Sequence, residues 1–281
     1  MTGRRILLLG SSGKCGTAIG NIFGDAYEIV GKNSTHFDAG DLQQVRGLVR
    51  ECACDIVVNA VAFVGIDQCE REPEKACAVN TLFPKLLAEL SAEMRFLLVH
   101  FSTDAVFADR TSGYYVESDS PRPCNSYGFT KAGADSFVQS IARRYYLVRI
   151  ALQFGETKKG NQFVEKMLQR VKEGRKVLDV SADIVSSPSY SKDVARRLRG
   201  LIEEEAPFGL YHLANDGQAS LFDLMQEVVL ALSLPVEVRK ASYKDFPSLG
   251  TRNTFTPIQS EKVGPLRPWR DAVAEYCRGL R

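Results

Sequence analysis

Short apolar runs alternate with longer segments in which apolar residues recur every three or four positions, through the first half of the chain. The short runs predict strands that are buried on both faces, and the longer period predicts amphipathic helices. Such strand–helix repeats are typical of a parallel sheet covered by helices. The expected strands are Arg5–Gly10, Tyr27–Gly31, Asp55–Asn59, Phe96–Phe101 and Tyr146–Ile150. The helices expected between them are Gly16–Phe23, Leu42–Glu51, Pro73–Glu93 and Tyr127–Ala142.

The second half of the chain has a less regular pattern, with short strands and several proline-containing loops. Its expected helices are Phe163–Glu173, Lys192–Glu204 and Leu221–Leu232, and its expected strands are Val177–Val180, Tyr211–Leu213 and Glu237–Arg239. We therefore predict an α/β protein with a doubly wound parallel sheet of the Rossmann type over residues 1–155. Residues 156–281 are expected to form a smaller, mixed substrate-binding region, from which the chain can cross back to the sheet.

Charge and hydropathy exclude several classes of protein. The 281 residues carry a formal net charge of +2, and acidic and basic residues alternate without forming the basic stripe of a nucleic-acid binder. No apolar run reaches the length of about 18 residues that a membrane span needs. The N-terminus leads directly into an apolar strand and lacks the features of a signal peptide. We expect a cytoplasmic protein with no nucleic-acid or membrane partner.

The seven cysteines and three histidines show no pattern of metal ligands. The segment Cys52-Ala53-Cys54 has the wrong spacing for a zinc pair, and no second pair lies near it. We interpret the cysteines as reduced, mostly buried thiols and expect no metal site. His100 and His212 fall within expected strands and are interpreted as packing residues.

A glycine-rich loop, Gly10-Ser11-Ser12-Gly13-Lys14-Cys15-Gly16, follows the first expected strand and opens a helix. Glycine is required where the chain turns tightly, where backbone approaches a pyrophosphate and where the helix packs closely on the strand. The helix N-terminus then offers free N–H groups to the phosphates. Without its context the loop could be a plain strand-to-helix turn, but the surrounding strand–helix repeats indicate dinucleotide binding by Gly10, Ser12, Gly13, Lys14, Cys15 and Gly16.

The end of the second expected strand bears on which dinucleotide is bound. The residues there are Val30-Gly31-Lys32-Asn33-Ser34, with no carboxylate to bind a ribose 2′-hydroxyl. Lys32 and Lys14 would instead favour a 2′-phosphate electrostatically. We therefore expect NADPH as the cofactor, with NADH as the alternative if Lys32 is an ordinary surface lysine.

Tyr127 is the one tyrosine with a lysine, Lys131, four residues later. On a helix this spacing places both side chains on one face, where the ammonium would favour the phenolate and lower the pKa of Tyr127. Thr103 follows the fourth expected strand, and functional groups of parallel sheets collect at such carboxyl ends. Its hydroxyl could reach the same substrate carbonyl, or it could cap the following turn.

Several motifs occur in the order found in extended short-chain dehydrogenases. They are the glycine loop, Asn59-Ala60-Val61-Ala62, Val79-Asn80, Ser102-Thr103-Asp104-Ala105-Val106-Phe107 and Tyr127-Gly128-Phe129-Thr130-Lys131. Within that group the chain resembles the dTDP-4-dehydrorhamnose reductase family over nearly its whole length.

The resemblance implies a reaction and a set of site residues. NAD(P)H would deliver hydride to the C4 ketone of a nucleotide-linked 6-deoxyhexose, with Tyr127 as proton donor, Lys131 at the nicotinamide ribose and Thr103 at the carbonyl oxygen. Asp41 and Leu42 would lie near the adenine. Further cofactor contacts would come from Asn59, Ala60, Val61, Ala62 and Asn80. The nucleotide sugar would contact Ser102, Thr103, Asp104, Ala105, Leu152, Asn161 and Arg252.

Three departures from the family pattern fall on the substrate side. Ala105 stands where the family has tyrosine, Leu152 where it has tryptophan, and Asn253 follows Arg252 where it has proline. The sugar, the nucleobase and the product stereochemistry therefore stay open, as does the presence of a homodimer.

Two alternatives remain. A sugar-nucleotide epimerase or dehydratase could use the same fold, although a dehydratase needs an acid–base pair after Thr103, and Asp104 is followed by Ala105. A regulatory subunit could retain the nucleotide pocket without turnover. It would have no need for Thr103, Tyr127 and Lys131 together.

Overall fold

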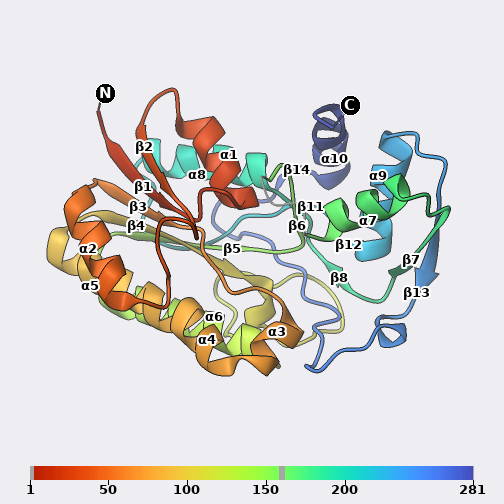
Figure 1. Cartoon of the computed structure of the whole chain (residues 1–281), viewed down its shortest axis with the longest axis horizontal. Coiled ribbons are helices and arrows are strands. Elements are labelled where there is room, and N and C mark those ends of the chain that lie inside the picture. The colour runs from red at the N-terminus through yellow and green to blue at the C-terminus, as the bar shows by residue number, and fades with distance from the viewer. Residues whose placement is uncertain (1–2, 158–161, 281) are drawn as a thin grey trace.

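A parallel sheet of six strands forms the centre of the computed structural model, which describes residues 3–157 and 162–280 (Figure 1). The strand order is β10–β5–β4–β3–β1–β2. The strands are β1 (Arg5–Leu9), β2 (Glu28–Lys32), β3 (Ile56–Asn59), β4 (Leu97–Thr103), β5 (Tyr145–Ile150) and β10 (Gly209–His212). Because β1 lies between β2 and β3, the winding of the chain reverses there. Ligands of such sheets bind at this switch point, outside the carboxyl ends of the strands.

Helices cover both faces of the sheet (Figure 1). One face carries α1 (Lys14–Phe23) and α8 (Ser191–Glu203), and the other carries α2 (Leu42–Cys52), α5 (Phe83–Met94) and α6 (Ser126–Ile141). Because both faces are covered, successive side chains of one strand enter two different cores. This explains the uninterrupted apolar runs in the sequence and confirms the predicted fold class.

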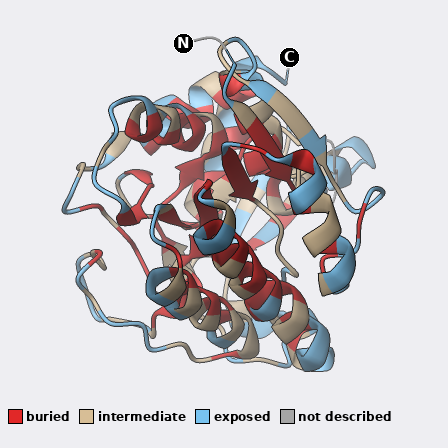
Figure 2. Cartoon of the chain, turned by 90° about the vertical axis from the view of Figure 1, so that its left-hand side faces the viewer, coloured by how far each residue is buried: buried red, intermediate tan, exposed pale blue. Residues whose placement is uncertain are grey.

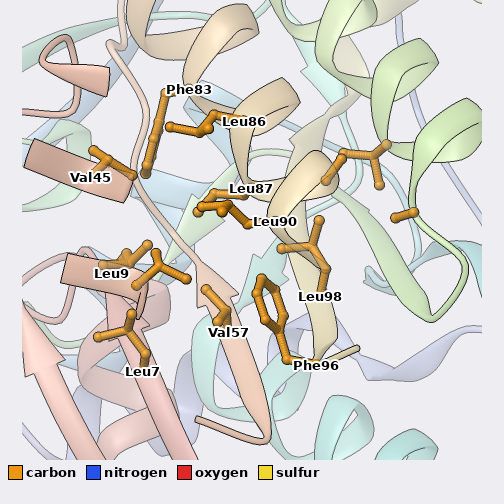
Figure 3. Close-up of a cluster of buried hydrophobic side chains, with 14 of the residues drawn as sticks. Leu7, Leu9, Val45, Val57, Phe83, Leu86, Leu87, Leu90, Phe96 and Leu98 are labelled. Atoms are coloured by element: carbon orange, nitrogen blue, oxygen red, sulfur yellow. The ribbon is translucent and has the colours of Figure 1, made fainter. Parts of the chain in front are cut away.

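The core beneath α2 and α5 shows this packing directly. Leu7 and Leu9 of β1 point into it, next to Val57 of β3 and Leu98 of β4, and Phe83 of α5 closes it from the helical side (Figure 3). The intervening β1 residues belong to the opposite core. Burial is accordingly concentrated along the strands and the inner faces of the helices (Figure 2).

The expected helix Pro73–Glu93 is divided into three segments. These are α4 (Pro73–Cys77), a π-helical turn η1 (Ala78–Leu82) and α5, and a short helix α3 (Ile66–Arg71) that the sequence pattern did not predict precedes them. Asn80 lies within the π-helical turn. Its Oδ1 accepts from Phe63 N at 2.8 Å, and its Nδ2 donates to Phe63 O at 2.9 Å. The irregular turn thus holds the loop that follows β3, in keeping with the frequent occurrence of π turns at functional sites.

The second region has a core of its own beside the sheet (Figure 1). Its helices are α7 (Phe163–Lys172), α9 (Leu221–Ala231) and α10 (Trp269–Arg278), and its longest strands are the parallel pair β7 (Val177–Ser181) and β13 (Glu237–Ala241). Its shorter elements are β8 (Val185–Ser186), β9 (Ser189–Tyr190), β11 (Asn215–Asp216), β12 (Ala219–Ser220), η3 (Tyr243–Asp245) and β14 (Leu266–Pro268). Two further short elements, η2 (Asp104–Val106) and β6 (Gln153–Phe154), follow β4 and β5 of the sheet. In the described part of the chain, no helix has the length and apolarity that a membrane span requires.

Part of the chain after residue 156 belongs to the sheet and its covering helices, as the expected return of the chain to the sheet allows. After leaving the sheet, the chain returns as α8, which packs against α1, and as β10, which pairs with β5 at the edge of the sheet. Residues 191–212 therefore complete the region of the central sheet. The remainder of 156–281 forms the second region.

Candidate active site

A cleft of about 680 Å³ opens at the carboxyl ends of β1, β3, β4 and β5, at the switch point of the sheet. It brings together the predicted residues Gly10, Ser12, Gly13, Lys14, Cys15, Ala60, Val61, Ala62, Ser102, Thr103, Asp104, Tyr127, Lys131 and Leu152. It is also lined by residues that the sequence did not single out, namely Asn33, Ser34, Phe37, Asp38, Ala39, Val64, Phe101, Ile150, Ala151, Gln153 and Gln162.

The glycine loop has the backbone geometry that phosphate binding requires. Gly10 has a φ of +88°, and a Cβ there would lie 2.7 Å from Ala60 O. Gly13 caps the N-terminus of α1 with no side-chain hydrogen bond, which leaves the first N–H groups of the helix facing the cleft. Gly16 lies outside the cleft lining and instead permits close contact between α1 and Gly10 O.

Lys14, which we expected to favour a 2′-phosphate, lines the cleft and forms an ion pair with the second region. Its Nζ lies 3.1 Å from Glu165 Oε2 of α7, and its side chain is 1% exposed. Lys32 also lies outside the cleft lining. Its contribution comes from the backbone, because Lys32 O accepts the N–H groups of Gly10 and Ser11. The Lys14 ammonium is thus already paired with a carboxylate, and the expected contact of these two lysines with a 2′-phosphate stays a prediction.

The two residues expected near the adenine, Asp41 and Leu42, lie just beyond a segment that lines the cleft. Phe37, Asp38 and Ala39 line the cleft, whereas Asp41 and Leu42 do not. Asp41 is the N-cap of α2, and its Oδ1 accepts the N–H groups of Gln43 and Gln44 at 3.1 and 3.0 Å. An aspartate directly before a helical pattern is a capping signal, and this signal could have corrected the assignment.

The proposed catalytic side chains come from β4 and the first turns of α6. Asn125 begins this helix as its N-cap, accepting Gly128 N at 2.8 Å. Tyr127 and Lys131 follow one turn apart, on the face that lines the cleft. Gly128 allows the helix to approach η2, because a Cβ there would collide with the carbonyl group of Ala105. Thr103, the last residue of β4, is thereby placed beside the helix.

Burial dominates the protonation of this pair. It raises the pKa of Tyr127, and a hydrogen bond with Thr103 opposes the shift only in part. From the sequence we expected Lys131 to lower the pKa of Tyr127. The pKa is raised instead, so this expectation was wrong. Burial also lowers the pKa of Lys131 to about 8, against the opposing charge of Asp135. A phenol that keeps its proton at neutral pH is suited to proton donation.

The chain matches one known family over nearly all of its length. Residues 4–281 match the family described as the RmlD substrate binding domain. The chain belongs to this family. A dTDP-4-dehydrorhamnose reductase of Mycolicibacterium smegmatis is 32% identical over 97% of this chain and 84% of its own length. A probable dTDP-4,6-dihydroxy-2-methyloxan-3-one 4-ketoreductase of Streptomyces antibioticus is 30% identical over 96% of this chain and 94% of its own length.

Solved structures of the RmlD family share the fold. The dTDP-4-dehydrorhamnose reductase of Bacillus anthracis, solved in complex with NADP, has a TM-score of 0.92 at 26% identity, covering 99% of this chain and 100% of that one. The counterpart from Clostridium acetobutylicum has a TM-score of 0.90 at 27% identity, covering 98% and 99%. A UDP-glucose 4-epimerase of Thermus thermophilus, at 19% identity and a TM-score of 0.80, shows the same fold.

Asp104 connects the two regions of this RmlD-family chain. Its Oδ2 accepts the hydroxyls of Ser186 and Thr256, both at 2.7 Å, and its Oδ1 accepts the Thr103 hydroxyl at 3.1 Å. Burial raises the pKa of Asp104. Asp104 lines the cleft, but protein hydroxyls bind both of its carboxylate oxygens, so it positions Thr103 relative to the second region. Sequence reasoning missed Ser186 and Thr256, which lie 82 and 152 residues away along the chain.

The expected substrate contacts are only partly gathered in the cleft. Leu152 lines it, with a φ of +31° that is uncommon for a residue other than glycine. Ala105 is buried outside the lining. Arg252 also lies outside it, with Nη2 at 3.4 Å from Asp67 Oδ2 and Nε donating to Ser248 Oγ at 3.0 Å. Asn161 lies outside the described residues.

The cofactor contacts expected from Asn59 and Asn80 are also absent from the cleft lining, because both side chains are fully buried behind it. Asn59 Oδ1 accepts Val61 N at 3.0 Å, and Asn80 holds the backbone of Phe63. The two asparagines shape the loop that lines the cleft. Within residues 3–157 and 162–280, no cluster of three or more His, Cys, Asp or Glu residues is arranged to hold a metal ion.

Glu165→Gln is expected to lower the free energy of unfolding by about 3 kcal/mol, because it leaves the buried Lys14 ammonium without its carboxylate. Chemical denaturation measures this loss. Glu93→Gln is the matched control, since its partner Arg50 lies 2.8 Å away in a pair whose side chains are 50% and 53% exposed. Its loss is expected to stay below about 1 kcal/mol. If the two variants lost equal free energies of unfolding, the buried Glu165–Lys14 pair between the two regions would contribute no more than the exposed Glu93–Arg50 pair.

Proposed function

We propose that this chain catalyses the NADPH-dependent reduction of the C4 ketone in a nucleotide-linked 4-keto-6-deoxy sugar. The observation that carries the proposal is one cleft that holds both the glycine loop and the side chains of Thr103, Tyr127 and Lys131. A dinucleotide bound along the loop would reach the carboxyl ends of β4 and β5, where those side chains lie. The dTDP-4-dehydrorhamnose reductase and 4-ketoreductase names of the relatives support this reaction.

Three residues of the chain would each have a role in transferring one proton to the substrate. When bound, the reduced nicotinamide supplies the hydride. Tyr127 gives its phenolic proton to the oxygen that gains negative charge. Thr103 would turn its single hydroxyl proton from Asp104 Oδ1 to the same oxygen. Donors placed where charge develops stabilise the transition state more than the ground state. Lys131 would bind the nicotinamide ribose and return a proton to Tyr127.

The residues that line the cleft after β2 support the preference for NADPH. Asn33 and Ser34 line the cleft directly after β2 and put neutral polar groups where NAD-specific enzymes have a carboxylate. The nearest acid, Asp38, has its Oδ1 bound by Gly40 N at 2.8 Å. The NADP complex of the Bacillus anthracis relative also supports NADPH, while NADH remains the alternative.

The cysteines and the exposed apolar side chains bear on the compartment and the oligomeric state of the protein. Free cysteines, most of them buried, suit a reducing compartment, so we infer a cytoplasmic protein. A homodimer is supported by the exposed apolar side chains of Phe129 on α6 and Leu82 on η1, which are 62% and 41% exposed. Light scattering of the purified chain would distinguish a dimer from a monomer.

The function is tested by adding dTDP-4-keto-6-deoxyglucose to the purified protein with NADPH, and separately with NADH, and following the absorbance of the reduced nicotinamide. Oxidation of NADPH with release of a reduced sugar nucleotide is the expected result. Cofactor binding without reduction of any sugar nucleotide in a panel would favour a regulatory subunit. Retained cofactor that turns over without net oxidation would favour an epimerase.

A further inference from the structure

Beneath the proposed catalytic residues lies a chain of buried polar side chains from three different elements. Asn59 ends β3, His100 lies within β4 and Lys131 is on α6, and their exposed fractions are 0%, 0% and 1%. Asn59 Nδ2 is 3.0 Å from His100 Nδ1, and His100 Nε2 is 3.3 Å from Lys131 Nζ. Lys131 Nζ also donates to Phe101 O at 2.6 Å. His100, interpreted from the sequence as a packing residue, therefore contacts the proposed catalytic lysine.

The orientation of the Asn59 amide is determined by its backbone neighbour. Val61 N donates to Asn59 Oδ1 at 3.0 Å. An amide nitrogen cannot accept a hydrogen bond, so the oxygen of Asn59 must be the atom that faces Val61. The NH₂ group then faces His100 Nδ1 and must donate to it. Nδ1 therefore carries a lone pair and no proton.

The proton of the imidazole is thereby placed on its other nitrogen. Burial and the neighbouring Lys131 lower the pKa of His100 well below its ordinary value, so the ring is neutral and has a single N–H. Because Nδ1 accepts from Asn59, this N–H lies on Nε2 and faces Lys131 Nζ. The lone pair of an amine can accept it, whereas an ammonium group has no lone pair and meets the N–H with its own positive hydrogens.

We propose that Asn59 and His100 are positioning residues that hold the imidazole proton on Nε2 and thereby favour the neutral amine of Lys131 over its ammonium form. Their value to the reaction rests on the proposed function. After Tyr127 has given its proton to the substrate oxygen, its phenolate regains one from the Lys131 ammonium. The O–H bond of Tyr127 forms as an N–H bond of Lys131 breaks, and the resulting amine accepts the Nε2–H.

Other charges around Lys131 act against this pair. Asp135, one turn further along α6, favours the ammonium, and Arg149 of β5 partly neutralises Asp135 through a contact of 2.9 Å. Tyr127 lies one turn before Lys131 on the same helix. Burial lowers the pKa of Lys131 to about 8, which agrees with a site where the ammonium is only weakly preferred. Lys131 can therefore release and regain a proton near neutral pH.

The position of the proton can be measured without any turnover. The chain has three histidines, so ¹⁵N-histidine NMR gives a small set of signals, and His100→Phe assigns the one from His100. We expect a neutral ring protonated on Nε2 from about pH 6 to about pH 9, where an unperturbed histidine would titrate. A ring protonated on Nδ1, or one that becomes imidazolium in this range, would overturn the proposal.

Asn59→Asp tests the link to Lys131. The carboxylate can accept both Val61 N–H and a proton on Nδ1, which turns Nε2 into an acceptor for the ammonium. If reduction requires the ammonium, the rate falls as pH rises through the pKa of Lys131, and this limb of kcat/KM should move up by about one pH unit. In the His100→Phe background most of the shift should disappear. The same shift in both backgrounds would show a direct charge effect and refute a role for His100.

The NMR result and the activity assay separate this inference from the proposed function. Protonation on Nε2 in a protein that reduces no sugar nucleotide supports the proton arrangement and refutes the function. Ketone reduction by a protein whose His100 is protonated on Nδ1 supports the function and refutes the inference.

Discussion

Tyr127→Phe is expected to lower kcat for ketone reduction by about 10³-fold, because it removes the proton donor and leaves the ring in place. Burial raises the pKa of Tyr127, so the wild-type phenol is protonated over the whole neutral range and can donate. Water is a poor substitute for a donor that α6 holds at a fixed place in the cleft lining. The remaining rate would reflect positioning of the ketone next to the cofactor.

Stopped-flow absorbance of NADPH measures this loss, and quenching of protein fluorescence measures cofactor affinity. The affinity should change little, since the glycine loop is untouched. Tyr145→Phe removes one hydroxyl at the opposite end of β5 and serves as the matched control, for which wild-type activity is expected. If Tyr127→Phe retained wild-type activity, Tyr127 could not be the proton donor.

Asp135→Asn is expected to lower the free energy of unfolding by about 3 to 5 kcal/mol, the usual cost of leaving one partner of a buried ion pair alone. Arg149 Nε lies 2.9 Å from Asp135 Oδ2, and both side chains are 1% exposed. The guanidinium group also lies over the Phe107 ring, 5.0 Å from its centroid, and 3.5 Å from His212 Nε2. Neither neighbour carries the negative charge needed to replace the carboxylate.

Chemical denaturation with Asp179→Asn as control measures this effect. The Asp179–Arg239 pair has a similar distance of 3.1 Å, but both side chains are 54% exposed. Its loss is expected to stay below about 1 kcal/mol. Because Asp135 raises the pKa of Lys131, Asp135→Asn should also move the alkaline limb of kcat/KM to lower pH, opposite to Asn59→Asp. Equal stability losses in the two variants would mean that burial does not set the strength of the Asp135 pair.

The second region contributes to the cleft as well as covering it. Glu165 neutralises Lys14 at the glycine loop. On β6, just before the second region, Gln153 Nε2 donates to Cys15 Sγ at 2.7 Å. Burial raises the pKa of the Cys15 thiol to about 12, which makes it an unreactive packing group. Ser186 and Thr256 bind the carboxylate beside Thr103. Loss of contact between the regions would therefore disturb the glycine loop and the proposed catalytic residue Thr103 together.

Most features that depend on neighbours in the chain were predicted correctly. Each strand expected in the first half is present, and its ends differ from the expected ones by at most two residues. The glycine loop follows β1, and Tyr127 and Lys131 lie one turn apart on α6. Hydrophobic period, glycine at a turn and helical spacing are local properties, so the sequence displays them directly.

Assignments that depend on where a side chain points were less successful. Lys14 stands in the phosphate loop, but its ammonium turns toward Glu165, more than 150 residues away along the chain. Asp41 was expected near the adenine, but its side chain caps α2, and Asp38 lines the cleft three residues earlier. Asn59 ends the expected strand with its side chain toward His100 and away from the cleft. A residue type at a motif position therefore did not establish a ligand contact.

The sequence by itself determined the parallel sheet, the glycine loop after its first strand, the shared helix of Tyr127 and Lys131, and the place of Thr103 at the carboxyl end of β4. These follow from periodicity and spacing within a few residues. Only the tertiary structure decided the protonation of Tyr127, Lys131 and His100, the pairing of Lys14 and the place of Asp104 between the two regions. Burial and contacts between distant segments set these properties, because desolvation and Coulomb energies depend on distances in space.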